Sequence, residues 1–395
     1  MTTAPARPRT DLLETFRSVR ALTDRLTRDL SPEDQTPQSM TEASPVKWHR
    51  AHTTWFFEEF VLGADPAYRP RHPDFRFLFN SYYEAVGDRH PRPDRGLVTR
   101  PGVAEVAAYR RDVEEQVEAA LEAGRLEQDR LTLVELGCHH EQQHQELLLT
   151  DILCTLSHNP LAPAMREGTP PVVPAAEAGW VEHPGGEVAI GHAGGGFAFD
   201  NETPRHLARL APFAVANRLV TNAEFEAFVE DGGYRRAALW LSDGWATVQA
   251  QGWQRPLYWR DGGRHFTLHG EQPRRPDEPV LHLSFYEAAA YAEWAGARLP
   301  TEFEWEAAAT APRPPAQCFG AAWQWTRSSY DPYPRYRPWA GAVGEYNGKF
   351  MVGQLVLRGS SAATPAGHER ASYRNFFPPA ARWQFSGLRL AKDLS

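Results

Sequence analysis

The sequence has few cysteines, little excess charge and no long apolar run, and each of these features excludes a class of protein. Only three cysteines occur among 395 residues, Cys138, Cys154 and Cys318, and an odd number at wide spacing excludes a disulfide framework or a cysteine zinc site. The formal net charge of −8 argues against a dedicated nucleic-acid binder, which usually has a strongly basic face. No apolar run approaches the roughly 20 residues that span a bilayer, and the first ten residues lack the apolar core of a secretory signal. We therefore expect a cytoplasmic protein with no nucleic-acid or membrane partner.

The first half of the chain predicts helices. Apolar residues recur there at every third or fourth position, which is typical of amphipathic helices. The predicted helices cover residues 12–26, 45–60, 103–126 and 129–156, with Ser44 as N-cap and Pro45 as first residue of the second. Residues 69–101 are predicted to form a long ordered loop. Four long helices with one long connection indicate a four-helix bundle.

The second half has a different texture. It is rich in tryptophan, glycine and proline, with short alternating runs at Gly186–His192 and His206–Phe213 that predict strands. Two helices are predicted, Asn222–Glu230 and Ser284–Ala295, each behind a residue suited to an N-cap. The sequence therefore predicts a multidomain α+β protein, with a helical domain over residues 1–160, a Pro-, Ala- and Gly-rich linker over 161–180 and an α+β domain over 181–395.

The clearest local signal is a run of histidines and amides on the fourth predicted helix, His139-His140-Glu141-Gln142-Gln143-His144-Gln145-Glu146. His140 and His144 are four residues apart, so their imidazoles project from one helix face about one turn apart. His49 or His52 of the second helix would complete a three-histidine metal site with open coordination positions. From spacing alone the metal is zinc, nickel or iron, and a solvated or hydrogen-bonded histidine pair is the alternative.

A resemblance to a known family extends over most of the chain. The pattern His140, His144 and Glu146, with the segment Trp48–Glu58, resembles the DinB-like N-terminal domain of the ergothioneine-pathway sulfoxide synthases, whose close relatives include selenoneine synthase. The second half resembles their formylglycine-generating-enzyme-like domain, which has a C-type-lectin-like α+β fold. The segments that carry this resemblance are residues 79–87, 239–245, 298–302, 344–350, 374–379 and 381–387.

The resemblance implies a mononuclear non-haem iron(II) enzyme. Such enzymes use O₂ to join a sulfur or selenium donor to C2 of the imidazole of hercynine (Nα-trimethylhistidine). By motif the iron ligands are His52, His140 and His144; His52 is preferred because the family ligand precedes Thr-Thr-Trp, and His49 stays open. Tyr82 and Tyr83 resemble a tyrosine pair that some subclasses place at the iron, where one phenol would donate a proton or hydrogen bond.

The resemblance also implies small-molecule substrate contacts in both halves. Gln143 resembles the family residue that contacts the hercynine imidazole. A trimethylammonium group cannot donate hydrogen bonds, so aromatic faces or carboxylates must hold it. Arg89, Arg92 and Arg95 recur at every third position and would recognise a carboxylate or sugar of the donor, with a solvated loop as the alternative. In the second half, the candidate substrate-binding residues lie in one of the segments that carry the resemblance: Arg374, Asn375, Phe376 and Phe377.

The donor side departs from the family pattern. Where relatives commonly read Phe-Gly-Asp-Val-Trp-Glu-Trp-Thr, this sequence has Ala321 and Gln324 at the two acidic positions. Ser360 and Ala362 stand where glycine and cysteine are expected. Lost carboxylates suit a donor other than an amino acid, so we expect a selenosugar donor, as in selenoneine synthase, with cysteine or γ-glutamylcysteine as the alternative.

A distant alternative is a non-catalytic binding module whose bundle holds a structural zinc ion. Structural zinc sites are closed by four protein ligands. This alternative therefore predicts a fourth ligand beside the three histidines.

Overall fold

The computed structural model describes residues 9–394, and the chain divides into two compact units. The first unit holds the chain up to Arg166 together with two later segments, Gly194–Phe197 and Trp339–Tyr346. The second unit holds the remainder. Residues 1–8, part of the segment for which we expect no secretory signal, lie outside the described part of the chain. No helix within residues 9–394 combines the length and apolar character needed to cross a membrane.

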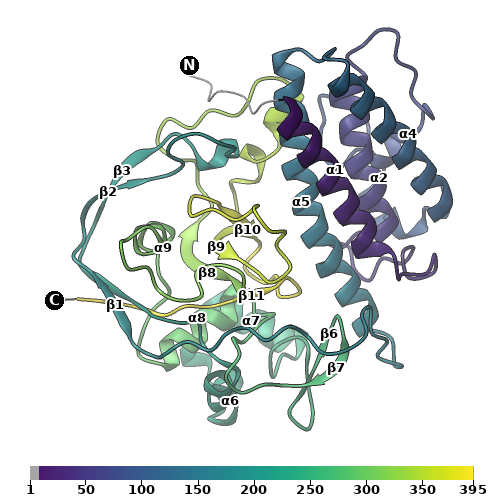
Figure 1. The fold of residues 1–395 in the computed structure, drawn as a ribbon. Coiled ribbons are helices and arrows are strands. Elements are labelled where there is room, and N and C mark those ends of the chain that lie inside the picture. The colour runs from purple at the N-terminus through teal and green to yellow at the C-terminus, as the bar shows by residue number, and fades with distance from the viewer. Residues whose placement is uncertain (1–8, 395) are drawn as a thin grey trace. The chain divides into compact units, whose positions relative to one another are not determined.

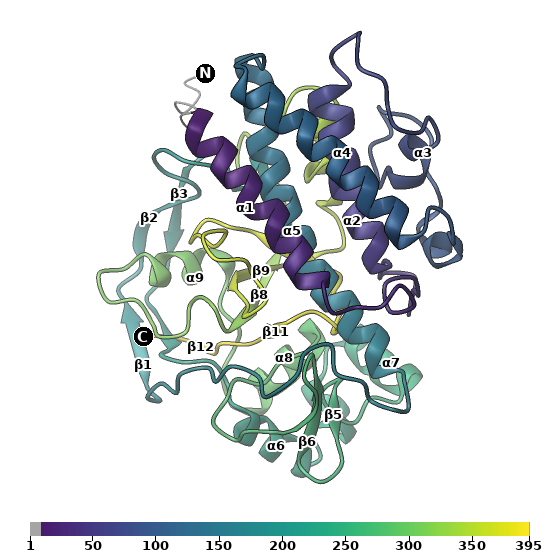
Figure 2. The same cartoon turned by 45° about the vertical axis from the view of Figure 1, so that its right-hand side comes forward.

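The first unit is a helical bundle (Figure 1). Helix α1 packs against α5, and α2 packs against both α4 and α5, as the turned view also shows (Figure 2). The four predicted helices are confirmed, whereas the predicted loop over residues 69–101 contains two short helices, α3 and η2. The bounds are α1 Arg9–Thr27, α2 Val46–Phe57, the π-helix η1 Glu58–Leu62, α3 Phe75–Phe79, the 3₁₀ helix η2 Arg92–Leu97, α4 Val103–Glu122, α5 Gln128–Ser157 and the 3₁₀ helix η6 Ala342–Glu345.

Helix α2 begins one residue later than expected. Pro45 occupies the N-cap position with φ −58° and ψ 146°, and no side chain caps the helix. The Ser44 hydroxyl instead accepts a hydrogen bond from Arg95 Nη1 at 3.0 Å. The Ser44 backbone N–H donates to Asp151 Oδ2 of α5 at 2.8 Å. Tertiary contacts therefore occupy the groups that sequence reasoning assigned to a local cap.

Helices α2 and α5 approach each other closely at a glycine. A Cβ atom at Gly137 of α5 would lie 2.5 Å from Cε1 of Phe57, well inside van der Waals contact. Phe57 is fully buried, so its ring has no room to move aside. The absence of a side chain at Gly137 permits the approach of the two helices that carry the histidines.

A buried ion network stabilises the interior of the bundle. Glu141 is fully buried and accepts hydrogen bonds from Arg20 Nη1 at 2.7 Å, Arg110 Nη2 at 2.7 Å and the Thr23 hydroxyl at 2.6 Å. Burial alone would raise the pKa of Glu141, but the charges of Arg110 and Arg20 and the Thr23 hydroxyl lower it to about 2. These contacts link α1, α4 and α5 through one carboxylate.

The second unit is α+β, as predicted (Figure 1). Its central sheet has the strand order β10-β9-β8-β11, with β8 antiparallel to β9 and parallel to β11. Two three-stranded sheets, β1-β4-β12 and β5-β6-β7, and the hairpin β2-β3 complete it. The strands are β1 Trp180–His183, β2 Gly186–Ile190, β3 His206–Leu210, β4 Phe213–Ala216, β5 Trp259–Arg260, β6 Arg264–Thr267, β7 Gly270–Pro273, β8 Ala322–Ser329, β9 Leu355–Ser360, β10 Asn375–Phe377, β11 Ser386–Gly387 and β12 Ala391–Asp393.

The second unit has more helix than the sequence predicts. Helices α6 and α8 match the two predicted helices, but α7 and α9 were not predicted. Thr301 and Glu304 form a capping box at the start of α9, a Thr-x-x-Glu signal that was legible in the sequence. The helices are α6 Asn222–Glu230, α7 Ser242–Gln251, α8 Phe285–Trp294 and α9 Glu302–Ala309, with short 3₁₀ helices η3 Asp200–Glu202, η4 Gly233–Arg235, η5 Ala237–Leu239 and η7 Gly348–Phe350.

We predict that Glu141→Gln destabilises the bundle strongly. The substitution keeps the side-chain volume but removes the fully buried negative charge that Arg20 and Arg110 share. Breaking a buried ion pair in this way costs about 3–5 kcal/mol. The measurement is the free energy of unfolding of the full chain in urea, followed by far-ultraviolet circular dichroism.

The matched control is Glu118→Gln. Glu118 pairs with Arg17 at 2.6 Å on the surface, where the two side chains are 29% and 48% exposed. An exposed pair contributes about 0–1 kcal/mol, so this variant is expected to unfold close to the wild type. Equal effects of the two substitutions would contradict a structural role for the network.

Candidate metal centre

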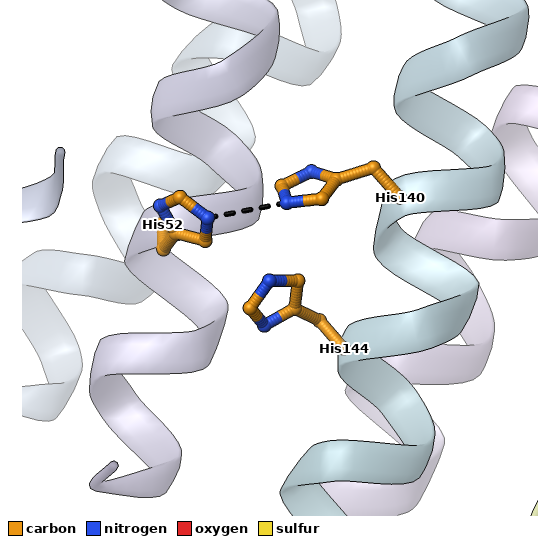
Figure 3. Close-up of side chains that lie close together, drawn as sticks. All are labelled: His52, His140 and His144. Carbon is orange, nitrogen blue, oxygen red and sulfur yellow. Dashed lines mark hydrogen bonds between the residues drawn. The ribbon is translucent and has the colours of Figure 1, made fainter. Parts of the chain in front are cut away.

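Three histidines from two helices point toward one another in the first unit (Figure 3). Helix α2 supplies His52, and α5 supplies His140 and His144; one nitrogen from each lies within 4.8 Å of the others. His52 Nε2 and His140 Nε2 are 3.1 Å apart. Two nitrogens that bind one metal ion at about 2.1 Å and at right angles lie about 3.0 Å apart. The spacing therefore fits a shared ion.

The hydrogen bond of His52 sets its tautomer. Its Nδ1 lies 2.6 Å from the backbone carbonyl oxygen of Phe79. A carbonyl oxygen only accepts, so Nδ1 carries the proton, and Nε2 of the neutral ring presents a lone pair to the cluster. A second partner that fixes the ring in this way is typical of metal-binding histidines.

A chain of hydrogen bonds orients His144. Asp151 Oδ2 lies 3.0 Å from His49 Nε2, and His49 Nδ1 lies 2.8 Å from His144 Nδ1. The carboxylate accepts from His49 Nε2, so Nδ1 of a neutral His49 accepts the proton of His144 Nδ1. His144 Nε2 then also presents a lone pair. The sequence did not decide between His49 and His52 as the third ligand. In the structure His49 lies between Asp151 and His144, which is the position of a residue that orients a ligand.

Burial keeps the cluster neutral. Burial, followed by the charge of His140, lowers the pKa of His52 well below its usual value. Burial likewise lowers the pKa of His140 to about 3, although the neighbouring Glu141 raises it. The pKa of His144 is lowered well below its usual value by burial and by His140 and His52. Three neutral imidazoles are the ligand set that zinc, copper, iron and nickel accept.

The histidine group has no fourth protein ligand among residues 9–394: His52, His140 and His144 are the members that come together. The Nδ1 atom of His140 is buried without a hydrogen-bond partner. Burying such a polar atom costs free energy, so packing alone gives no reason for a histidine at this position. A closed structural zinc site would need another ligand. The donor set instead fits an ion with open coordination positions.

Aromatic rings fix the histidines from the sides. The Trp48 ring stacks on His52 with centroids 4.6 Å apart and an interplanar angle of 11°. Trp55 stacks on the same ring at 5.5 Å and 17°, and Phe56 packs against His140 at 4.7 Å. These rings occupy positions one turn before and after His52 on α2, so the helix itself builds an apolar wall around the cluster.

Tyr346 places its ring against a histidine of the group. Its ring lies edge-on to His140 with centroids 5.7 Å apart, and its hydroxyl donates a hydrogen bond to Gln143 Oε1. The ring centroids of Tyr82 and Tyr346 are 6.3 Å apart, and the Tyr82 ring stacks on that of Tyr83. Gln143 and His140 therefore share Tyr346 as a neighbour.

Tyr83 differs from Tyr82 in its surroundings. It is fully buried and packs against Trp55 and Phe60 of the bundle. Burial, and then the neighbouring phenols of Tyr82 and Tyr346, raise its pKa well above the usual value. The side chain thus supports the Tyr82 ring from within the core.

The three arginines at Arg89, Arg92 and Arg95 have different environments. Arg89 is exposed and pairs with Glu84 at 2.9 Å, and Arg92 is exposed and bonds to the Glu42 carbonyl. Arg95 is buried, with Cζ 3.5 Å from the centre of the Trp48 ring. Burial, and then the charges of Arg92 and Arg89, lower the pKa of Arg95 to about 8. Regular spacing in sequence therefore does not give one shared surface.

In the second unit, the predicted substrate segment is held by a buried ion pair. Arg374 is 2% exposed and binds Glu302 through Nε at 2.8 Å and Nη2 at 2.9 Å, while Nη1 donates to the Asn201 carbonyl. Its guanidinium therefore has structural partners. Asn375, Phe376 and Phe377 form the half-buried strand β10, with Phe376 stacked on Tyr330 at 4.1 Å.

Two of the positions that depart from the family pattern make hydrogen bonds inside the second unit. Gln324 is fully buried; its Oε1 accepts from Trp305 at 2.7 Å and Arg389 at 2.9 Å, and its Nε2 donates to the Cys318 carbonyl at 2.9 Å. Ser360 is buried and accepts from the Gly320 backbone N–H at 2.8 Å. Ala321 is buried in the core, whereas Ala362 is exposed.

Sequence reasoning missed two residues that the structure brings to the cluster. Tyr346 lies about 200 positions beyond Gln143 in the chain, and its segment, Trp339–Tyr346, belongs to the first unit. Glu345 anchors that segment by accepting hydrogen bonds from the backbone N–H groups of Glu84 at 3.0 Å and Ala85 at 2.8 Å. Asp151 lies seven residues after His144, hence on the same helix face, and that spacing was a usable signal.

Comparison with known proteins agrees with this architecture. Residues 15–148 match the DinB superfamily, and residues 169–314 match the sulfatase-modifying factor enzyme 1-like domain. A hercynine oxygenase of Mycolicibacterium thermoresistibile is 32% identical over 406 residues, covering 89% of this chain and 88% of that protein. A hercynine oxygenase of Mycolicibacterium smegmatis is 35% identical, covering 65% of this chain and 70% of that protein.

A second group of relatives matches a smaller part of the chain. The formylglycine-generating enzyme of Streptomyces coelicolor is 38% identical over 174 residues, which cover 38% of this chain and 52% of that enzyme. The α+β class and the order of the two domains are thus confirmed. With a DinB domain followed by a sulfatase-modifying-factor-type domain, and with a hercynine oxygenase that is 32% identical over 89% of this chain, the chain belongs to the hercynine oxygenase family.

Proposed function

We propose that this protein is an iron(II)- and O₂-dependent enzyme that forms a carbon–chalcogen bond at C2 of the hercynine imidazole. The observation that carries the proposal is the cluster of His52, His140 and His144, three neutral imidazoles whose nitrogens converge. Membership of the hercynine oxygenase family supplies the substrate class. Small molecules are accordingly the proposed partners of the chain.

The three histidines would hold the iron, and the chain prepares them for it. Bound iron(II) would supply the one-electron chemistry that O₂ requires and would leave positions open for both substrates. The Phe79 carbonyl and the Asp151–His49 pair hold protons on Nδ1 of His52 and His144. Their Nε2 lone pairs are therefore directed to the ion before it arrives, which lowers the reorganisation that binding demands.

Gln143 and Tyr346 are proposed to handle the hercynine imidazole. Gln143 Oε1 accepts the Tyr346 hydroxyl, and this fixes the amide orientation so that Nε2 is the group that donates to an imidazole nitrogen. Tyr346 lies against His140 and is proposed as the proton donor at the reacting centre. The sequence pointed to Tyr82 and Tyr83 for the proton-donor role. Tyr82, whose ring lies beside that of Tyr346, is proposed to assist Tyr346 in proton donation, and Tyr83 is proposed to support the Tyr82 ring.

Within the second unit, Phe376 and Phe377 are proposed as residues that bind a quaternary ammonium group. Phe376 and Phe377 are half-buried aromatic residues on β10, and aromatic faces attract a quaternary cation. Arg374 holds this strand through Glu302, and Asn375 accepts from the Phe376 backbone N–H at 2.9 Å. Arg374 is thus proposed to position the aromatic residues.

For the donor we propose a selenosugar, with cysteine or γ-glutamylcysteine as the alternative. Arg95 is a buried cation beside Trp48 and is proposed to bind the hydroxyl or carboxylate oxygens of the donor; Arg89 and Arg92, which are exposed and held by Glu84 and the Glu42 carbonyl, are left out of this role. The selenosugar is favoured by Ala362, an exposed small side chain at a position where the family pattern has cysteine.

The metal-binding proposal predicts different losses for neighbouring histidines. His52→Ala is expected to abolish bound iron because it removes a ligand. His49→Ala is expected to retain iron with affinity lowered about 10–100-fold, the usual effect of removing a group that orients a ligand. Metal analysis and iron(II) titration of the purified full chain measure both.

His139→Ala is the control for these substitutions. His139 precedes His140 on α5 but stacks on Phe197 with centroids 3.8 Å apart, so its loss is expected to leave iron binding unchanged. Full iron binding by His52→Ala, or zinc bound with no O₂ uptake in the presence of hercynine, would sink the proposal.

The proton-donor proposal predicts that Tyr346→Phe lowers the rate of product formation by about 10²–10⁴-fold. Iron content is expected to stay the same because the phenol is not a ligand. Tyr68→Phe is the matched control. It removes a hydroxyl that donates a hydrogen bond to Glu58 Oε1 at 2.8 Å and is not part of the histidine group. Unchanged turnover of Tyr346→Phe with both substrates saturating would exclude the role.

The donor proposal predicts turnover with a selenosugar. Iron(II)-loaded protein is offered hercynine and O₂ with either 1-seleno-glucose or cysteine, and products are identified by mass spectrometry. We expect a carbon–selenium product from the first mixture. If cysteine gives product and the selenosugar gives none, the selenosugar proposal is wrong and the thiol donor takes its place.

A further inference from the structure

A polar cavity lies in the bundle, apart from the histidine cluster. It has a volume of about 380 Å³ and is lined by residues of α1, α2, α4 and the loop after α1. Its residue from α2 is Arg50, which is two positions before His52. Two residues correspond to about 200° around a helix, so the cavity and the histidine cluster lie on opposite faces of α2.

Two buried arginines form the inner wall of the cavity. Arg50 is 8% exposed and Arg110 is 1% exposed. Arg50 uses Nη1 on Gln35 at 3.2 Å and Nη2 on Asp24 at 3.1 Å, but its Nε is buried without a partner. Arg110 uses Nη2 on Glu141, and its Nη1 is buried without a partner. Buried N–H groups of this kind are normally satisfied, so both guanidinium groups beside the cavity keep unused hydrogen-bonding capacity.

The cavity carries an excess of positive charge. Two exposed arginines, Arg28 and Arg111, line it together with Arg50 and Arg110, whereas Asp24 is its one lining carboxylate. Glu114 and Glu141 face Arg110 from the bundle interior and are shared with Arg20. Burial, and then the charge of Arg110, lower the pKa of Arg50, while Asp24 raises it. The like charges are thus only partly compensated.

We propose that this cavity binds a small organic phosphate. Guanidinium groups form paired, charge-assisted hydrogen bonds with phosphate oxygens, and four arginines, Arg28, Arg50, Arg110 and Arg111, line this cavity. The volume falls within the range of small-molecule pockets, about 300–1,000 Å³, which leaves room for more than the phosphate group. Leu30 and Ala107 line the same cavity and suit the carbon part of such a ligand. The site is independent of the function proposed above.

Calorimetric titration of the full chain tests the proposal, with inorganic phosphate, glucose 6-phosphate and citrate as probes. Both phosphates are expected to bind, glucose 6-phosphate more tightly, and both more weakly at high salt because salt screens the arginine charges. Each phosphate is also expected to raise the melting temperature, since a ligand that binds only the folded state stabilises it. Absence of heat and of a melting shift with both phosphates overturns the site, and tighter binding of citrate overturns its assignment to phosphate.

Substitutions at the mouth locate the binding. Arg28→Gln with Arg111→Gln is expected to weaken glucose 6-phosphate binding about tenfold or more, because two charge-assisted contacts are lost. Asp24→Asn is expected to strengthen binding, because it removes the carboxylate that competes for Arg50 and Arg110. The control is Arg25→Gln with Arg125→Gln, which has the same charge change at exposed positions outside the cavity. Equal affinity of the mouth variant and the control, or no gain with Asp24→Asn, overturns the proposal.

Discussion

The packing of α2 against α5 is the constraint on which the candidate metal centre depends. His52 comes from one helix and His140 and His144 from the other, so the 3.1 Å separation of two ring nitrogens exists only while the helices stay close. Gly137 permits that approach at Phe57. Asp151 of α5 binds both His49 and the backbone before α2, so the carboxylate that orients a histidine also fixes where α2 begins.

Adjacent residues of α5 perform opposite electrostatic tasks. Burial lowers the pKa of His140 to about 3, which keeps a lone pair available for a metal. The next residue, Glu141, remains ionised in an equally buried place because Arg110 and Arg20 compensate its charge and lower its pKa to about 2. Since the two side chains project about 100° apart on the helix, the neutral cluster and the ion network occupy different faces. One helix thus serves a metal site and the bundle core.

Periodicity and spacing predicted the parts of this protein that are local in sequence. The four long helices follow from apolar repeats, and the pairing of His140 with His144 follows from a four-residue interval. Ser44 failed as an N-cap because Arg95, about 50 positions away, takes its hydroxyl. Spacing did not distinguish His49 from His52, since both lie on α2, and only the contacts of each ring separate them. Tyr346 was not predictable from spacing because its segment reaches the first unit from about 200 residues beyond α5.

The departures from the family pattern do not all bear on the donor. Gln324 uses its oxygen for Trp305 and Arg389 and its nitrogen for a backbone carbonyl; a glutamate there would set a charged oxygen against that carbonyl. Hydrogen bonding within the core therefore explains why glutamine occupies position 324. Ser360 likewise bonds to the backbone of Gly320, and Ala321 is enclosed. Ala362 alone among these four is exposed, so the sequence evidence for an unusual donor reduces to one position. A cysteine introduced there is consequently a more direct probe of donor choice than a carboxylate restored at position 321 or 324.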